Sequence, residues 1–346
     1  MNREHLPALA RFSRTALLEG ATPIQRLPRL EQALGKDAAN ICLFVKRDDL
    51  MGIGGGGNKL RKLEFLIGEA LASGCDTFIT TGGIQSNHAR LSAAVAGRAG
   101  LACELILRRV VPREDEAYRR NGNILLDELF GATIHDLPGD ADAAAFAAER
   151  ADLLRKQGRR PYVVMASGGS TPVACLGYAA CAAEIVAQER AAAENFTRII
   201  VPNGSSGTHA GLAAGLAALG ADPLRVQSFA VLTPAAATRG RTHELACAAL
   251  ALLQEDAAID PAAIDVVGDQ LGAGYGIPTE AMFEAVHLMA RTEGLLLDPV
   301  YGGKAFAGLL AALRAGVYRA GDAVLFIMTG GTPGLFAYRP AFDPRI

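Results

Sequence analysis

Lys46-Arg47-Asp48-Asp49 and, after four residues, Gly54-Gly55-Gly56-Gly57-Asn58-Lys59 form the stretch that decides the fold of this chain. The four glycines let the backbone approach a bulky ligand closely, because no Cβ is in the way. Lys59 stands where this loop becomes a helix, whose apolar residues recur with helical spacing from Leu60 to Ala70. A rigid element therefore presents the Lys59 amine to a bound group.

The loop by itself leaves simpler interpretations open. It differs from the phosphate loop of nucleotide-binding proteins, because Asn58 separates Gly57 from Lys59 and no Gly-Lys-Ser/Thr sequence is present. A glycine-rich turn that carries a solvated lysine is also commoner than a covalent cofactor site. The other motifs of the chain decide between these interpretations.

Four motifs resemble, in the same order, those of one enzyme family: Lys46-Arg47-Asp48-Asp49, Gly56-Gly57-Asn58-Lys59, Gln85-Ser86-Asn87-His88 and Asp298-Pro299-Val300-Tyr301. The family is that of D-cysteine desulfhydrase and 1-aminocyclopropane-1-carboxylate deaminase, which uses pyridoxal 5'-phosphate (PLP). The resemblance runs from Thr22 to Tyr338. It implies that Lys59 forms the Schiff base with the cofactor.

Composition excludes several other classes of protein. Half of the 346 residues are apolar and the formal net charge is −2, so neither nucleic acid nor an anionic membrane surface is an expected partner. No apolar run reaches the roughly 18 residues of a membrane span. None follows Met-Asn-Arg-Glu-His at the amino terminus either, so we expect no secretory signal. The six cysteines and the histidines lack metal-binding spacing, so we expect free thiols in a cytoplasmic protein without a metal.

Strands alternate with helices along the chain, which indicates an α/β protein with parallel sheets and helical crossovers. The expected strands are 40–45, 77–81, 102–107, 133–135, 162–165, 198–202, 226–232 and 323–328. The expected helices after the one at Lys59 are 89–100, 122–130, 141–157, 177–192, 209–219, 242–254, 279–291 and 305–315. The resemblance implies PLP fold type II, the tryptophan synthase β-subunit fold, with two three-layer lobes and the active site between them. We expect residues 1–62 and 171–346 to form the large PLP-binding domain and 63–170 a small inserted domain.

A second loop, 203–208, combines features that hold a phosphate. It follows an expected strand and precedes an expected helix, so its N–H groups and the positive helix end face the same point. A tight turn is the alternative, but beside Lys59 we interpret the loop as the cofactor phosphate site. Lys62 matches the family's lysine that helps to bind this phosphate. The expected cofactor-binding residues are Lys59, Lys62, Asn87, Gly204, Ser205, Ser206, Gly207, Thr208 and Thr329.

Matches to the family also assign substrate and catalytic roles. Asn87 matches the residue that hydrogen-bonds the ring hydroxyl, and Ser86 one that contacts the substrate carboxylate or assists proton transfer. A generic helix cap is the alternative for both residues. Tyr275 and Tyr301 match two active-site tyrosines that orient the substrate or act as acid and base, unless they merely pack in a wall. The catalytic set is Lys59, Ser86, Tyr275 and Tyr301; the substrate-binding set is Ser86, Asn87, His88 and Tyr275.

Three departures separate this chain from the deaminases. Gly302 stands where they carry a glutamate, Ser170-Thr171-Pro172 where they tend to have Ser-Asp-His, and His88 where they have glutamine. Thr329 resembles the threonine that meets the ring nitrogen in the desulfhydrases. A neutral hydroxyl stabilises a protonated ring nitrogen less than a carboxylate does. That favours expulsion of a β leaving group over opening of a cyclopropane ring.

We therefore expect a PLP-dependent lyase that performs α,β-elimination on a small β-substituted amino acid. The resemblance favours D-cysteine, which gives pyruvate, ammonia and sulfide. L-cysteate, with sulfite leaving, is the first alternative, followed by 1-aminocyclopropane-1-carboxylate and by a PLP-binding protein without turnover. The resemblance also implies a homodimer, and the stereochemistry of the substrate stays open.

Overall fold

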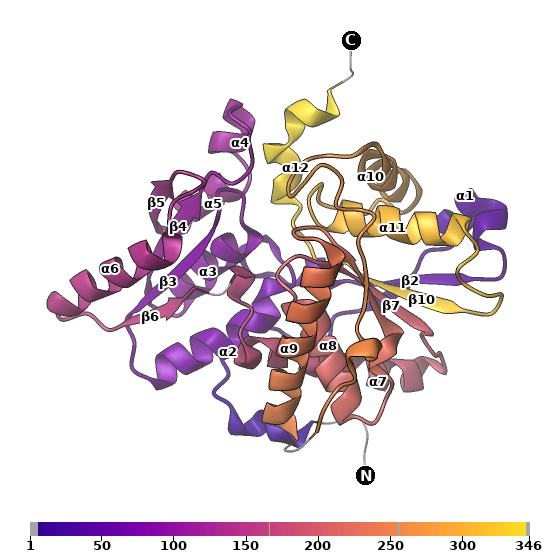
Figure 1. Ribbon diagram of the computed structural model, residues 1–346, viewed down its shortest axis with the longest axis horizontal. Coiled ribbons are helices and arrows are strands. Elements are labelled where there is room, and N and C mark those ends of the chain that lie inside the picture. The colour runs from indigo at the N-terminus through magenta and orange to yellow at the C-terminus, as the bar shows by residue number, and fades with distance from the viewer. Residues whose placement is uncertain (1–5, 166, 255–256, 344–346) are drawn as a thin grey trace.

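The fold is known from a computed structural model, which describes residues 6–165, 167–254 and 257–343. It contains two sheets that lie side by side, with helices on both faces of each (Figure 1). The larger sheet consists, in spatial order, of β1 (Ile24–Arg26), β2 (Cys42–Lys46), β10 (Ala323–Ile327), β7 (Arg198–Asn203), β8 (Val226–Ala230) and β9 (Asp265–Val267). The smaller sheet consists of β5 (Thr133–Leu137), β4 (Ala102–Arg108), β3 (Thr77–Gly83) and β6 (Pro161–Val164).

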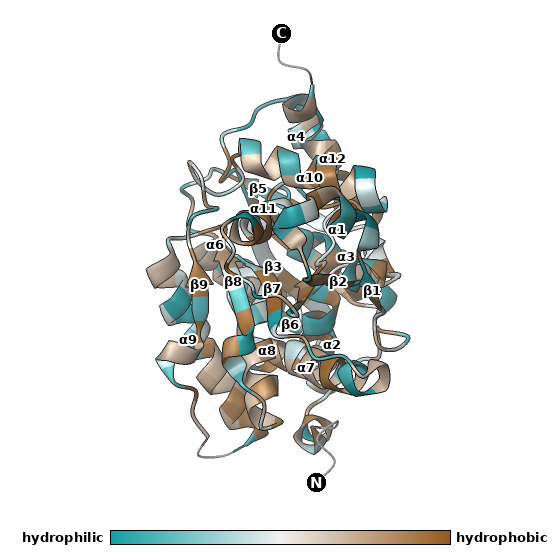
Figure 2. Cartoon of the chain, turned by 90° about the vertical axis from the view of Figure 1, so that its right-hand side faces the viewer, coloured by the Kyte–Doolittle hydropathy of each residue, from teal (hydrophilic) through white to brown (hydrophobic). Residues whose placement is uncertain are grey.

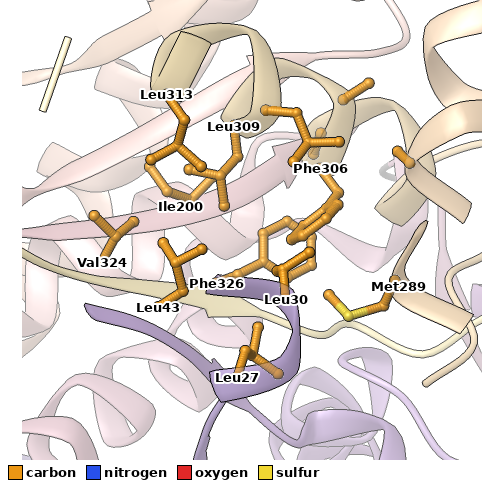
Figure 3. Close-up of a cluster of buried hydrophobic side chains, with 14 of the residues drawn as sticks. Leu27, Leu30, Leu43, Ile200, Met289, Phe306, Leu309, Leu313, Val324 and Phe326 are labelled. Carbon is orange, nitrogen blue, oxygen red and sulfur yellow. The ribbon is translucent and has the colours of Figure 1, made fainter. Parts of the chain in front are cut away.

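The larger sheet buries both of its faces because apolar residues occupy successive positions of its strands. Val324 and Phe326 face α1 (Pro28–Leu34), α10 (Glu280–Glu293) and α11 (Gly302–Arg314), and Figure 3 shows Phe326 beside Phe306 of α11. Leu325 and Ile327, one residue out of step, face α7 (Pro172–Ala192) and α8 (Gly207–Ala218). Side chains of a strand alternate between the faces, so this unbroken apolar run predicts a central strand.

The smaller sheet is covered in the same way. Phe78 and Leu105 pack against α2 (Lys59–Ala72) and α3 (Asn87–Arg98), whereas Ile79 and Ile106 pack against α6 (Ala143–Lys156). Three short helices, α4 (Glu116–Arg120), α5 (Asn123–Leu129) and α12 (Pro333–Ala337), complete this side of the molecule. Helix α2 therefore carries Lys59 to the region between the two sheets.

Helix α8 is apolar along nearly its whole length (Figure 2), because it is enclosed by α7, the sheet and α9 (Ala235–Leu253). Glycines allow this packing: a Cβ on Gly211 would lie 2.3 Å from the backbone oxygen of Cys175. The helix is thus fixed in position, and so is the loop at its N-terminus.

The expected fold class is confirmed, and each expected strand and helix has a counterpart. Several details differ. Strand β1 runs antiparallel to β2, so the larger sheet is mixed rather than parallel. The three-residue strands β1 and β9 were not expected, and α7 and α9 begin earlier than expected, at Pro172 and Ala235.

The division into domains stays a prediction. Its first boundary, between residues 62 and 63, falls within helix α2. Residues 1–5 and 344–346 of the expected large domain lie outside the described residues. Within the described part of the chain, no helix combines the length and the apolar character needed to cross a membrane.

Candidate active site

A cavity of about 270 Å³ opens where the carboxyl ends of β3, β7 and β10 meet the N-termini of α2 and α3. In α/β sheets ligands bind beyond the carboxyl ends of the strands, where connections leave in opposite directions. Most of the expected site residues line this cavity: Lys59, Ser86, Asn87, His88, Gly204, Ser205, Ser206, Thr208, Tyr275, Tyr301 and Thr329. Lys62 and Gly207 do not line it, although both were expected to bind the cofactor.

The glycine loop holds Lys59 at the cavity by packing tightly on its surroundings. Gly56 has a φ of 72°, and a Cβ there would lie 2.2 Å from the backbone oxygen of Asp49. The Asn58 amide donates to the backbone oxygen of Thr329 at 3.0 Å, which fastens the start of α2 to the end of β10. Only glycine combines this conformation with such close contact, which explains the glycine run.

Burial lowers the pKa of Lys59 well below its ordinary value, and the neighbouring Lys62 lowers it further. Desolvation disfavours the charged form of an amine, and a second ammonium has the same effect. The unprotonated Lys59 amine is a nucleophile, so the site favours covalent attachment of a carbonyl compound.

Lys62 lies directly behind the cavity and is fully buried. Its Nζ donates to Ser170 Oγ at 2.8 Å, and Ser170 Oγ donates to Ser205 Oγ at 2.9 Å. No carboxylate of the described residues forms an ion pair with this ammonium. Burial of an uncompensated charge is costly, so the arrangement calls for an anion at this point.

The loop after β7 completes an anion cradle next to Lys62. Ser206 adopts the left-handed conformation, with a φ of 67°, and Thr208 accepts a hydrogen bond from Asn58 Nδ2 at 3.0 Å. The first N–H groups of α8 lack intrahelical acceptors and are directed out of the helix end. A Cβ on Gly207 would lie 2.6 Å from Ser170 Oγ and 2.7 Å from Lys62 Nζ. The cradle thus fits a phosphate, and with Lys59 it fits PLP.

The N-terminus of α3 forms the opposite wall. Ser86 is the N-cap of α3, and its Oγ accepts a hydrogen bond from the Ala89 amide at 3.1 Å. Ser86 therefore does cap the helix, as the alternative interpretation held. Its hydroxyl also lines the cavity. His88 is buried, and its Nε2 lies 2.9 Å from Thr80 Oγ1.

Tyr275 and Tyr301 form a pair in which the two hydroxyl oxygens are 2.6 Å apart. Burial raises the pKa of both phenols, and for Tyr301 the neighbouring Tyr275 contributes to the rise. Both groups therefore keep their protons at neutral pH, and the pair can donate a proton or a hydrogen bond but is a poor base.

Two charged residues without an assigned role position these tyrosines. The Asp298 carboxylate accepts hydrogen bonds from the amides of Val300, Tyr301 and Gly302, at 2.7 to 2.9 Å. Lys304 Nζ donates to the backbone oxygens of Leu271 and Gly274, at 2.8 and 3.0 Å, and so fixes the loop before Tyr275. Asp298 belongs to a motif quoted above, and its place before a helix start could have indicated this role, whereas nothing in the sequence links Lys304 to residue 274.

Comparisons with known proteins agree with this geometry. The family described as pyridoxal-phosphate dependent enzyme matches residues 15–330. The D-cysteine desulfhydrase of Yersinia enterocolitica is 43% identical over 338 residues, which cover 96% of this chain and 98% of the relative. The D-cysteine desulfhydrase of Serratia proteamaculans is 41% identical, with the same coverage.

Solved structures show the same similarity. A crystal structure of an ACC deaminase homologue has a TM-score of 0.85 and 35% identity, and covers 99% of this chain and 98% of its own. An O-acetylserine dependent cystathionine β-synthase from Helicobacter pylori has a TM-score of 0.59 and 19% identity, and covers 90% of this chain and 92% of its own. At that identity the second likeness concerns the fold alone.

Proposed function

The chain belongs to the family of pyridoxal-phosphate dependent enzymes, and from this premise we propose that it converts D-cysteine and water into pyruvate, ammonia and sulfide. The observation that carries the proposal is the pairing of a Lys59 amine whose pKa is lowered with an anion cradle around the buried Lys62. The D-cysteine desulfhydrase relatives support the choice of substrate. Lys59 is the attachment point of the cofactor, and loop 203–208 with Lys62 holds its phosphate.

The reaction needs a group that accepts the electron pair left at the substrate Cα, and PLP supplies it when bound. The unprotonated Lys59 amine would take the proton from the substrate Cα. The N–H groups at the start of α3 and the Ser86 hydroxyl hold the substrate carboxylate. The protonated Tyr275–Tyr301 pair donates to the leaving sulfur. Released aminoacrylate then hydrolyses to pyruvate and ammonia.

A second candidate substrate is L-cysteate, and Arg108 favours it. Arg108 ends β4 and lines the cavity. Among the described residues, the Arg108 guanidinium donates two long hydrogen bonds, to the backbone oxygens of Gly139 at 3.5 Å and Ala141 at 3.4 Å. A guanidinium so weakly engaged is available to a sulfonate, which it binds strongly.

Release of pyruvate by the PLP-loaded protein tests these alternatives directly. We expect D-cysteine to give equal amounts of pyruvate and sulfide. L-cysteate should react about 100-fold more slowly, because the proposed site stabilises the loss of sulfide better than the loss of sulfite. Faster release of sulfite from L-cysteate would move the assignment to a sulfo-lyase. Ammonia from 1-aminocyclopropane-1-carboxylate alone would make the protein a deaminase.

Replacement of Gly207 by alanine is expected to weaken the binding of PLP by about 10- to 100-fold, since forced packing costs about 1–3 kcal/mol. The new methyl group would meet Ser170 Oγ and Lys62 Nζ, the atoms proposed to face the phosphate. Titration of the apoprotein with PLP, followed by absorbance, measures the effect. Gly240→Ala in α9 is the matched control, because no atom lies within 4 Å of its Cβ. Equal affinity in the two variants would place the phosphate elsewhere.

For assembly and location we propose a homodimer in the cytoplasm. All six cysteines are free thiols, which agrees with a reducing compartment. Leu129 and Phe336 expose 70% and 59% of their surface, and such apolar residues are candidates for a subunit contact. We also propose that residues 1–62 and 171–346 form a large PLP-binding domain and that residues 63–170 form a small inserted domain.

A further inference from the structure

The Asn87 side chain lines the cavity, and the direction of its amide decides what it offers to a ligand. An amide presents an acceptor from its oxygen and two donors from its nitrogen. Asn123 Nδ2 lies 3.0 Å from Asn87 Oδ1, so the oxygen is engaged away from the cavity. The Asn87 nitrogen is then left for the ligand.

This direction follows from groups whose polarity cannot be reversed. Arg90 is a guanidinium that only donates, and its Nη1 lies 3.1 Å from Asn123 Oδ1. The other end of the Asn123 amide must therefore be its nitrogen, which also donates to the backbone oxygen of Gln85 at 2.9 Å. Asn87 can accept a hydrogen bond from the Asn123 side-chain nitrogen only through its own side-chain oxygen, Oδ1.

Asn123 itself has no freedom to turn. It is 1% exposed, and its backbone amide donates to Gln85 Oε1 at 2.9 Å. Gln85 is held in turn by the backbone oxygens of Tyr118 and Asn121, at 2.6 and 2.8 Å. Arg90 is fully buried and also donates to the backbone oxygen of Gly56 at 2.7 Å, in the glycine loop before Lys59.

We propose that Asn123 is a positioning residue that holds the Asn87 amide with its nitrogen toward the cavity, so that the site stabilises the ring oxygen of PLP in its ionised form. The inference rests on the proposed function, because it assumes that PLP binds beside Asn87. The PLP ring carries a hydroxyl next to its aldehyde carbon. A donor fixed opposite that oxygen favours the charged form over the neutral one.

The absorbance of bound PLP tests the inference, since an ionised ring hydroxyl absorbs at longer wavelength than a neutral one. In Asn123→Asp both side-chain oxygens accept, so the Asn87 amide has to turn its nitrogen away from the cavity. We expect absorbance to move from the long- to the short-wavelength band at neutral pH. We also expect PLP to bind about tenfold more weakly, the worth of one hydrogen bond to an ionised group. Asn123→Ala, which leaves Asn87 free to turn, should give a smaller change in the same direction.

Asp127→Asn is the matched control on the same helix. Asp127 lies one turn beyond Asn123, is fully buried, and its carboxylate oxygens have no hydrogen-bond partner among the described residues. Its replacement removes no hydrogen-bond partner of the Asn123 side chain, although Asp127 interacts electrostatically with Arg90. The absorbance band should therefore stay where it is in the wild type. An equal shift in Asp127→Asn would overturn the inference, because it would show that any disturbance of α5 has this effect.

The outcomes separate the inference from the function on which it rests. Wild-type protein that binds no PLP would overturn the proposed function and the inference with it. Wild-type protein that binds PLP, together with an unchanged band in Asn123→Asp, would overturn the inference alone. If Asn123→Asp does not fold, as judged by circular dichroism, the comparison of Asn123→Ala with Asp127→Asn decides in the same way.

Discussion

Replacement of Lys59 by alanine is expected to lower the turnover of D-cysteine by about 10³-fold or more, because we propose that this one side chain provides both the attachment point and the group that moves the Cα proton. Pyruvate release measures the loss. Lys59→Arg should be equally inactive, since a guanidinium remains charged and is no nucleophile. Loss of turnover in both variants would show that the amine itself is required, and that another long basic side chain cannot replace it.

Treatment with borohydride adds a readout that does not depend on turnover. It reduces the bond between lysine and cofactor, so peptide mapping of the wild type should find the cofactor on Lys59. Lys62→Ala keeps Lys59 and is the control: the label should persist, at lower occupancy, because the phosphate loses its buried ammonium. A label on Lys62 or Lys304, or turnover retained in Lys59→Ala, would contradict the assignment.

Asp48→Asn is expected to lower the free energy of unfolding by about 3–5 kcal/mol, the usual cost of breaking a buried ion pair. The Asp48 carboxylate is fully buried and accepts hydrogen bonds from Arg61 at 2.9 Å, Thr22 at 2.8 Å and Tyr178 at 2.6 Å. Arg61 also pairs with Glu184, to which Lys46 is joined at 3.1 Å. The charged Lys46-Arg47-Asp48-Asp49 motif thus supports the loop that carries Lys59.

Urea unfolding followed by circular dichroism measures this loss, and Asp152→Ala provides the control. Asp152 pairs with Arg155 on the surface of α6, where both side chains are more than half exposed, so its loss should change stability by less than about 1 kcal/mol. A similar effect of the two substitutions would mean that the buried network adds nothing to stability.

The contribution of Asp48 should also depend on pH. Burial by itself would raise the pKa of this carboxyl, but Arg61 and Lys46 hold it below the ordinary 3.8. A carboxyl whose pKa is lower in the folded state adds stability above its unfolded pKa, and the gain is lost as the pH falls through the folded value. The difference between wild type and Asp48→Asn should therefore shrink below pH 3.8.

Local sequence patterns predict much of the architecture, and the strands and helix starts that they did not predict have local causes. Long apolar runs such as Ala323–Ile327 identify the central strands, whereas three residues are too few to reveal β1 or β9. The true start of α7 has a clear signal, a Thr171 cap followed by Pro172, which the glycine-rich sequence before it obscured. The first residues of α9 are three alanines followed by polar residues and a glycine, so apolar periodicity begins only later in that helix.

The candidate site divides in the same way. Lys59, Ser86, Asn87 and loop 203–208 belong to contiguous motifs, and a single sequence is enough to propose them. Ser170, Arg90 and Asn123 act through contacts with residues far away in the chain, and their side chains are ordinary helix or loop residues when read alone. Arg90 and Asn123 meet where α3 packs against α5, and Ser170 meets Lys62 and Ser205 where three separate segments converge, so no local pattern could have predicted them.

The position of β10 between β2 and β7 has a consequence for synthesis on the ribosome. All strands of the smaller sheet are contiguous, within 77–164, so this sheet can form while later residues are still being added. The larger sheet cannot close until residues 323–327 emerge, and until then β2 and β7 have exposed edges that invite pairing with other chains. Because Thr329 lies two residues after the end of β10, the nascent protein acquires its complete cofactor cavity only after nearly all of these residues have been translated.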